Sequence, residues 1–208
     1  MIKVAIADDH ALMRQGIKNV LRLNKNIHVT IEAANGKILL EQLTLSDLPD
    51  VLLLDIQMPE MDGYETLSIL QREYPQIKVI MLSMIQDEFV VNNLLQRGAS
   101  AFIKKTTEPH EFLEVIKEVY NNSGSSQKQS KESAEKTEES SGIITNKEIE
   151  FLKYCPTYLT YEQIADKMLV SPKTLDHYRI SLFKKFNVQS RSELAGIAVR
   201  MGLGKAGF

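Results

Sequence analysis

Five polar residues in the first 120 positions have types and placements that suit phosphoryl chemistry. They are Asp8, Asp9, Asp55, Ser83 and Lys104, each at or just after the end of a short apolar run. Carboxylates gathered in one crevice repel one another unless a cation neutralises them, and Mg²⁺ prefers such oxygen ligands. A serine can donate a hydrogen bond, and a lysine supplies a point charge for a phosphoryl oxygen. The set predicts phosphoryl transfer with a carboxylate as nucleophile.

The elements that must position these residues alternate along residues 1–120. Strands are expected at Ile2–Asp8, His28–Ala33, Val51–Asp55, Lys78–Ser83 and Ala101–Ile103, and helices at Ala11–Leu23, Gly36–Leu45, Gly63–Glu73, Asp87–Arg97 and Glu108–Tyr120. Such strand–helix repeats predict an α/β fold with a parallel sheet covered on both faces. Ligands gather at the carboxyl ends of the strands in doubly wound sheets, so the polar residues are expected to converge there.

Composition divides the 208-residue chain into three parts. Residues 1–120 carry 12 basic and 17 acidic side chains, whereas residues 143–208 carry 10 basic and 6 acidic ones. Between them, residues 121–142 contain no Val, Ile, Leu or aromatic residue, which predicts a flexible linker. The basic balance of the last part favours a polyanion partner.

Other features of the sequence exclude several protein classes. Cys155 is the only cysteine, so no intrachain disulfide can form and a multi-thiolate metal site is not expected. The chain shows no secretory signal and no apolar run near the roughly 20 residues that span a bilayer. We therefore expect a cytoplasmic protein without a membrane partner.

Residues 143–208 predict an all-α domain of four helices. Three Ser/Thr residues are each followed three positions later by Glu or Gln, which is the capping-box pattern, and Ser171 precedes Pro172 at a fourth helix start. The expected helices are Asn146–Cys155, Tyr161–Lys167, Pro172–Phe186 and Arg191–Met201. The short connection 168–170 between the second and third is typical of a helix-turn-helix.

The third of these helices has two distinct faces. Leu175, Tyr178, Leu182 and Phe186 recur at helical spacing and predict the buried face. The opposite face carries Lys173, Thr174, Asp176, His177, Ile180 and Lys184. A basic helix of this kind can enter the DNA major groove, with polar side chains on base edges and lysines on phosphates.

The first part of the chain resembles a response-regulator receiver domain. The resemblance rests on Asp8-Asp9, the run from Asp55 to Gly63, Ser83 and Lys104, in the expected order on the expected elements. It implies a five-stranded parallel sheet of order 2-1-3-4-5 over residues 1–120. Many receivers have proline after the site lysine, whereas Lys105 follows Lys104 here.

The resemblance also implies roles for individual residues. Asp55 would accept a phosphoryl group from a phosphohistidine of a sensor histidine kinase. Asp9, Asp55 and the backbone carbonyl of Gln57 would bind Mg²⁺ directly, and Asp8 through water. Ser83 and Phe102 would form the switch pair, and Lys104 would contact the phosphoryl group. His10 is expected to be a helix-start residue near the site rather than a metal ligand.

Residues 143–208 resemble the LuxR-type helix-turn-helix domain of the NarL/FixJ subfamily. The residues that carry the resemblance are Ile144, Thr145, Glu148, Glu150, Thr160, Ile164, Ala165, Ser171, Thr174, Leu175, Lys185, Val188, Ser190, Arg191 and Leu194. The resemblance implies that Asp176, His177 and Ile180 read bases and that Thr174, Arg179, Lys184 and Lys185 meet phosphates of promoter DNA. Tyr178 and Asn187 stand where the family commonly has histidine and glycine.

The last helix carries an apolar stripe with two interpretations. Leu194, Ile197, Ala198 and Met201 recur at helical spacing. In the family such a surface forms a homodimer on DNA, although an apolar stripe is more often part of a core. We favour dimerisation through this stripe.

Together these features predict a phosphorylation-dependent, DNA-binding transcription regulator of a two-component system. Three alternatives stay open: a receiver that keeps its residues without being phosphorylated, a protein that sequesters a partner, and an aspartyl phosphatase. The phosphatase would want a second carboxylate two residues after Asp55, where Gln57 stands. We therefore expect no turnover enzyme, only slow self-dephosphorylation.

Overall fold

A computed structural model describes residues 1–84, 88–122 and 143–203. The chain divides into two compact units, Met1–Ala134 and Glu135–Phe208. The elements of the first unit are β1 (Ile2–Ala7), α1 (Ala11–Arg22), β2 (Ile27–Ala33), α2 (Gly36–Leu43), β3 (Val51–Asp55), α3 (Gly63–Glu73), β4 (Lys78–Ser83), α4 (Glu88–Gln96), β5 (Ala101–Lys104) and α5 (Pro109–Asn121). Those of the second are α6 (Asn146–Tyr154), α7 (Tyr161–Lys167), α8 (Pro172–Phe186) and α9 (Arg191–Arg200).

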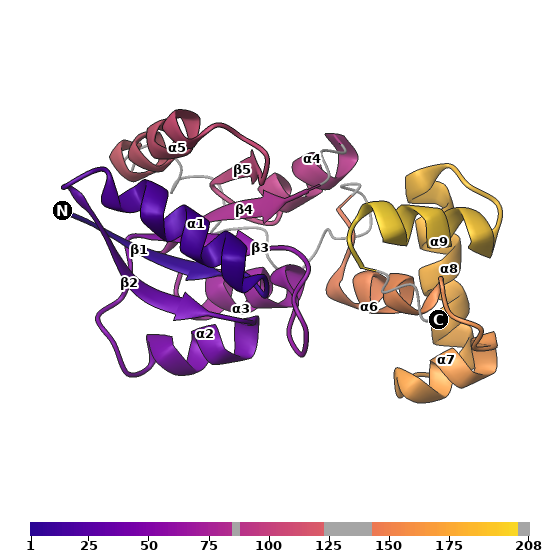
Figure 1. Ribbon diagram of the computed structural model, residues 1–208. Helices are drawn as coiled ribbons and strands as arrows, with labels where there is room; N and C mark the ends of the chain where they lie inside the picture. Colours follow the sequence, from indigo (N-terminus) through magenta and orange to yellow (C-terminus); the bar gives the residue numbers. More distant parts are fainter. Residues whose placement is uncertain (85–87, 123–142, 204–208) are drawn as a thin grey trace. The chain divides into compact units, whose positions relative to one another are not determined.

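The sheet of the first unit has the predicted doubly wound topology. Its five strands are all parallel, in the order β2-β1-β3-β4-β5. Helices α1 and α5 cover one face, and α2 and α3 cover the other (Figure 1). All five residues of β3, the central strand, are buried, which explains why that strand is apolar without alternation.

Apolar residues from both faces of the sheet form the core. On one face, Ile17 and Leu21 of α1 and Phe112 and Ile116 of α5 join a buried cluster with strand residues. The alternate strand positions, such as Leu52 and Leu54, are also fully buried. This packing fixes the register of β3 and therefore the position of Asp55 at its carboxyl end.

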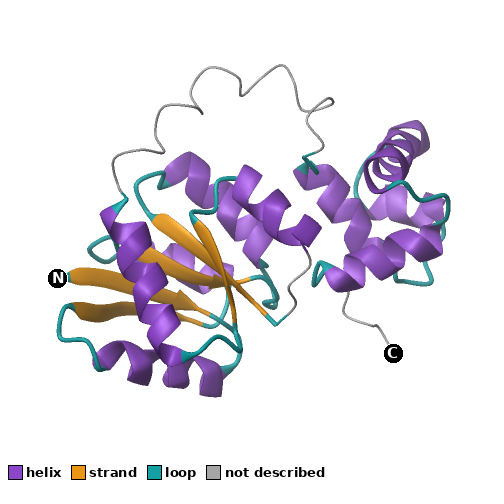
Figure 2. Cartoon of the chain, turned by 90° about the horizontal axis from the view of Figure 1, so that it is seen from above, coloured by secondary structure: helices purple, strands orange, loops and turns teal. Residues whose placement is uncertain are grey.

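The described residues of the second unit form the four predicted helices, and Figure 2 draws helices in purple. The capping boxes predicted at Thr145 and Thr160 are confirmed, with both reciprocal hydrogen bonds present. At Ser190 the hydroxyl accepts from the Glu193 amide, but the Glu193 carboxylate accepts from the Gln189 amide instead of completing the box. Helix α8 begins after the predicted Ser171 cap and ends just before its C-cap residue Asn187, whose φ of 53° is left-handed.

Two sequence-based expectations about boundaries lie partly outside the described residues. Asp87, the expected first residue of the fourth helix, lies outside the described residues, and so do residues 123–142 of the expected linker. Asn121, the first residue assigned to the linker, is the last residue of α5. Within the described ranges, no helix has the length and apolarity needed to cross a membrane.

Candidate phosphoacceptor site and nucleic-acid interface

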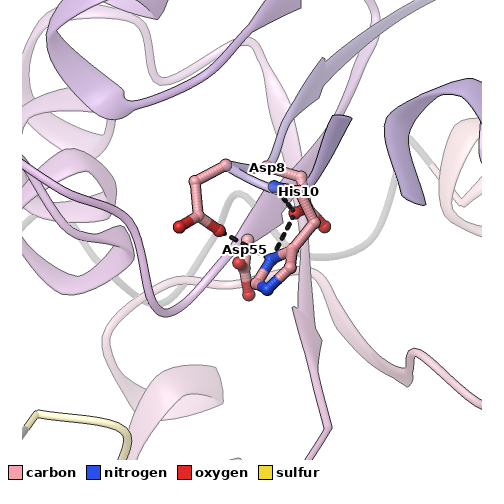
Figure 3. Close-up of side chains that lie close together, drawn as sticks. Asp8, His10 and Asp55 are labelled. Atoms are coloured by element: carbon pink, nitrogen blue, oxygen red, sulfur yellow. Dashed lines mark hydrogen bonds and ion pairs between the residues drawn. The ribbon is translucent and has the colours of Figure 1, made fainter. Parts of the chain in front are cut away.

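The carboxyl end of the sheet brings together the predicted acidic residues. Asp8 and Asp55 are buried, whereas Asp9 and His10 are exposed. Ligand atoms of these four residues all lie within 4.8 Å of one another. Figure 3 shows Asp8, His10 and Asp55 converging from the ends of β1 and β3. Because β1 and β3 are adjacent and parallel, the convergence follows directly from the strand order.

The loop after β3 holds Asp55 against the start of α3. The Gly63 amide donates to the Ile56 carbonyl at 2.9 Å, and Asp62 caps α3 by accepting from the Glu65 amide. A side chain at position 63 has no space, because a Cβ atom there would lie 2.4 Å from the Asp55 carbonyl oxygen. This close approach explains the glycine at the end of the run from Asp55 to Gly63.

Lys105 contacts both of the buried carboxylates. Its Nζ atom lies 2.6 Å from Asp8 Oδ2 and 2.9 Å from Asp55 Oδ2, and its side chain is only 4% exposed. Burial nevertheless raises the pKa of Asp55 to about 6, since desolvation outweighs the contact with Lys105 and the Gln57 amide. A further cation beside the ionised Asp55 carboxylate would therefore stabilise it.

The structure corrects the expectation that Lys104 occupies this site. Lys104 is the last residue of β5, where it pairs with Ser83, and its side chain is exposed. Alternate strand residues point to the same face, and Lys104 accordingly lines an open cavity beside α5 together with Phe102 and Glu111. Lys105 lies beyond the strand end, from where its long side chain reaches back to the carboxylates.

Ser83 and Phe102, the expected switch pair, lie on neighbouring strands. Ser83 ends β4 and is half-buried, and its carbonyl accepts a hydrogen bond from the Lys105 amide at 2.8 Å. Phe102 is half-buried in β5, where it pairs with Met81. Their role as a switch stays a prediction.

His10 is a helix-start residue beside the acidic residues, as predicted. It is the N-cap residue of α1. Its Nδ1 atom is 2.7 Å from Asp9 Oδ1 and 3.3 Å from Asp8 Oδ1, and its backbone amide donates to Asp8 Oδ1 at 2.8 Å. Asp8 therefore supports the loop before α1 as well as facing the carboxylate cluster.

The donor set fits a hard divalent cation. Asp8, Asp9 and Asp55 present carboxylate oxygens, the ligand type that Mg²⁺ prefers, and two of these groups are buried. The side chain of Gln57 is exposed, and its backbone amide hydrogen-bonds the Asp55 carboxylate. That its carbonyl oxygen is a metal ligand stays a prediction.

Comparison with known proteins identifies the family of the chain. Residues 4–117 match the response regulator receiver domain, and residues 143–198 match the luxR family of bacterial regulatory proteins. The response regulator UvrY of Escherichia coli strain K12 is 30% identical over 98% of this chain and 96% of its own length. The chain belongs to the NarL/FixJ family of response regulators.

Other relatives agree with this assignment. The response regulator GacA of Pseudomonas aeruginosa PAO1 is 31% identical over 98% of each chain. The receiver domain of a putative NarL from Mycobacterium tuberculosis is 30% identical and superimposes with a TM-score of 0.55, covering 58% of this chain and 97% of that one. RcsB of Salmonella enterica serovar Typhimurium, at 21% identity, shares the fold with a TM-score of 0.69 over 94% of this chain and 98% of its own. The two domain matches, together with the relatives UvrY and GacA, show that the chain is a DNA-binding transcription regulator of a two-component system.

Helix α8 of the response regulator presents most of the predicted DNA-contacting residues. Lys173, Asp176, His177, Ile180 and Lys184 are exposed. The Ile180 side chain adds apolar surface to this face, with 49% of the residue exposed. Thr174 is half-buried, and its hydroxyl lies 2.8 Å from that of Ser171.

Lys185 is the member of the predicted set that the structure removes from the surface. Its side chain is 10% exposed, and Nζ lies 2.7 Å from Glu148 Oε2 and from the Ile143 carbonyl oxygen. Glu148 is itself buried; desolvation opposes its ionisation, but Lys185, Ser181 and the Thr145 amide lower the pKa of its carboxyl overall. Lys185 therefore joins α8 to α6 and is a structural residue instead of a phosphate contact.

The apolar stripe of α9 also belongs to the core. Leu194, Ile197, Ala198 and Met201 are at most 6% exposed. The expectation that they form a dimer surface is therefore wrong, because they are already packed inside their own domain. Val199 of α9, which is not part of this stripe, is 47% exposed.

Arg191, one of the residues that carry the resemblance to the LuxR-type domain, has a structural role that the sequence analysis did not predict. Its guanidinium donates to the carbonyl oxygens of Tyr154, Cys155, Thr157 and Leu159, at 2.5–3.1 Å. These carbonyls lie at and just after the carboxyl end of α6, where backbone acceptors have no partner within the helix. An arginine in the first turn of a later helix gives no periodic signal of such a role.

Proposed function

We propose that phosphorylation of Asp55 by a sensor histidine kinase controls binding of promoter DNA by the second domain. The observation that carries the proposal is the Asp8–Asp55–Lys105 arrangement, with Lys105 Nζ 2.6 Å and 2.9 Å from the two carboxylates. It supplies an ionisable acceptor and a fixed cation within contact distance. The matches to a receiver domain and a luxR-type domain support a kinase and double-stranded DNA as the partners.

The phosphoryl step assigns a role to each group of the site. An Asp55 carboxylate oxygen attacks the phosphorus of a phosphohistidine, the P–O bond forms, and the P–N bond breaks with its electron pair going to the imidazole. Lys105 holds Asp55 in place and is close enough to contact an oxygen of the transferred group. Mg²⁺ held by Asp8, Asp9 and Asp55 would neutralise the charge that the phosphoryl group brings.

Coupling to DNA binding is proposed to run through the carboxyl end of β4 and β5. Ser83 and Lys105 are joined there by a backbone hydrogen bond, and the half-buried Phe102 lies two residues before Lys104 in β5. A phosphoryl group bound by Ser83 and Lys105 would shift this edge between two arrangements. Dimerisation of the phosphorylated chain would place two α8 helices on half-sites about 10 base pairs apart.

Mass spectrometry of the intact protein after incubation with acetyl phosphate and Mg²⁺ tests the phosphoacceptor. We expect an addition of one phosphoryl group in the wild type and none in Asp55→Asn. Asp9→Asn should slow the reaction strongly, since it weakens the metal site without removing the nucleophile. Persistent phosphorylation of Asp55→Asn would contradict the assignment.

A further inference from the structure

Arg179 of α8 contacts two residues on different elements. Its Nη2 atom lies 3.1 Å from Asp176 Oδ1, and its guanidinium carbon lies 5.1 Å from the centroid of the Tyr161 ring at the start of α7. The Arg179 side chain is 31% exposed, compared with 58% for Asp176. The cation is therefore mostly packed against its own domain, while the carboxylate that it contacts faces solvent.

The Tyr161 ring is held in place from other sides. The guanidinium carbon of Arg191 lies 5.4 Å from the ring centroid, and the Phe151 ring lies 6.3 Å away. Arg191 is fixed by its four hydrogen bonds to the carbonyls at and just after the carboxyl end of α6, and Phe151 is fully buried. The ring is thus a rigid, electron-rich surface for the Arg179 guanidinium.

The contact with Tyr161 lowers the conformational cost of the exposed ion pair between Arg179 and Asp176. A pair three residues apart on a helix surface is normally weak, because both side chains lose freedom when they meet. Here the Tyr161 ring already restricts Arg179, so less freedom is lost when the planar guanidinium meets Asp176. The Asp176 carboxylate is consequently held in one orientation on the predicted DNA-facing side of α8.

We propose that Arg179 is a positioning residue for sequence recognition, which orients Asp176 to accept a hydrogen bond from a cytosine N4 amino group in the major groove. The proposal rests on the proposed DNA-binding function. Glutamate and aspartate accept from cytosine N4, and a carboxylate close to DNA phosphates is repelled unless a cation accompanies it. Arg179 supplies that cation, and this role replaces the predicted phosphate contact.

The test begins with enrichment of binding sites from a random duplex library by the full-length protein with Mg²⁺ and beryllium fluoride. Anisotropy then measures binding to the enriched duplex and to its single-base variants. We expect wild type to prefer cytosine at one position of each half-site by about 10-fold or more. Asp176→Ala and Arg179→Gln should each reduce this preference below about 3-fold, and the double variant should lose no more than either single variant.

Two sets of controls separate positioning from folding and from phosphate binding. Tyr161→Phe keeps the ring and should keep the preference, whereas Tyr161→Leu should reduce the preference as Arg179→Gln does, with circular dichroism showing that the helices of the DNA-binding domain stay folded. Lys184→Gln should weaken all duplexes equally and lower the salt dependence of binding. If Arg179→Gln behaves like Lys184→Gln and keeps the cytosine preference, the positioning role is wrong. If wild type enriches no sequence, the proposed function fails as well.

Discussion

The Nζ atom of Lys105 lies 2.9 Å from Oδ2 of Asp55, with the lysine side chain almost completely buried. The same Nζ atom contacts Asp8 at 2.6 Å, so a single cation separates two buried carboxylates. This contact distinguishes Lys105 from its exposed neighbour Lys104 and provides a matched pair for mutagenesis.

Lys105→Gln should destabilise the receiver domain, because it leaves Asp8 and Asp55 without their cation. Breaking a buried ion pair of this kind costs about 3 kcal/mol or more. Urea unfolding in the absence of metal should show this decrease in the free energy of unfolding. Adding Mg²⁺ should restore part of it, since the ion supplies the missing positive charge.

Lys104→Gln is the control for this change. Its side chain is exposed, so its free energy of unfolding should stay within about 0.5 kcal/mol of wild type. An equal loss in both variants, or no recovery of Lys105→Gln with Mg²⁺, would contradict the role assigned to Lys105.

The raised pKa of Asp55 predicts a specific pH dependence of stability. Folding raises this pKa from 3.8 to about 6, so the folded state binds a proton more tightly than the unfolded state. The free energy of unfolding should therefore fall as pH rises from about 4 to 6, by an amount on the order of 3 kcal/mol from this group. Asp55→Asn removes the titrating group. In the absence of metal, the free energy of unfolding of wild type should therefore fall relative to that of Asp55→Asn over this pH interval. Parallel curves would show that Asp55 titrates normally.

Lys185 and Lys184 form a second matched pair, in the DNA-binding domain. Lys185→Met breaks the buried contact with Glu148 and should destabilise that domain by about 3 kcal/mol. Lys184→Met should leave the thermal midpoint nearly unchanged and reduce the salt dependence of DNA binding, because Lys184 is exposed on α8. Exchanged outcomes would reverse the assignment of the two lysines.

Cys155 should be unreactive in the folded protein. Its thiol is buried, and burial raises its pKa to about 12. Because the thiolate is the reactive form, Ellman's reagent at pH 8 should modify Cys155 only as the domain unfolds. Stoichiometric modification within seconds under native conditions would contradict the described packing.

Much of this architecture was predictable because it depends on local patterns. The β-strand Val51–Asp55, helix Gly63–Glu73 and helix α7 have the predicted bounds, and the Thr145 and Thr160 capping boxes form as expected. Apolar periodicity and Ser/Thr caps act within a few residues, so they are legible in a single chain.

Two wrong predictions concern neighbouring lysines whose side chains point in different directions. Lys104 and Lys105 are equivalent in composition, and the end of β5 decides which reaches Asp55. Lys184 and Lys185 differ by one step around α8, which places the second against Glu148. The α9 stripe was ambiguous because an apolar face does not specify whether its partner is the same chain or another.

The most direct test of the central claim is DNA binding by the full-length protein with and without beryllium fluoride and Mg²⁺. Anisotropy with DNA from upstream of its own gene, or with the enriched duplex, would measure affinity for wild type and Asp55→Asn. We expect fluoride and Mg²⁺ to tighten sequence-specific binding at least 10-fold in wild type and to leave Asp55→Asn unchanged. Equal affinity in all four samples would contradict control of DNA binding by phosphorylation of Asp55.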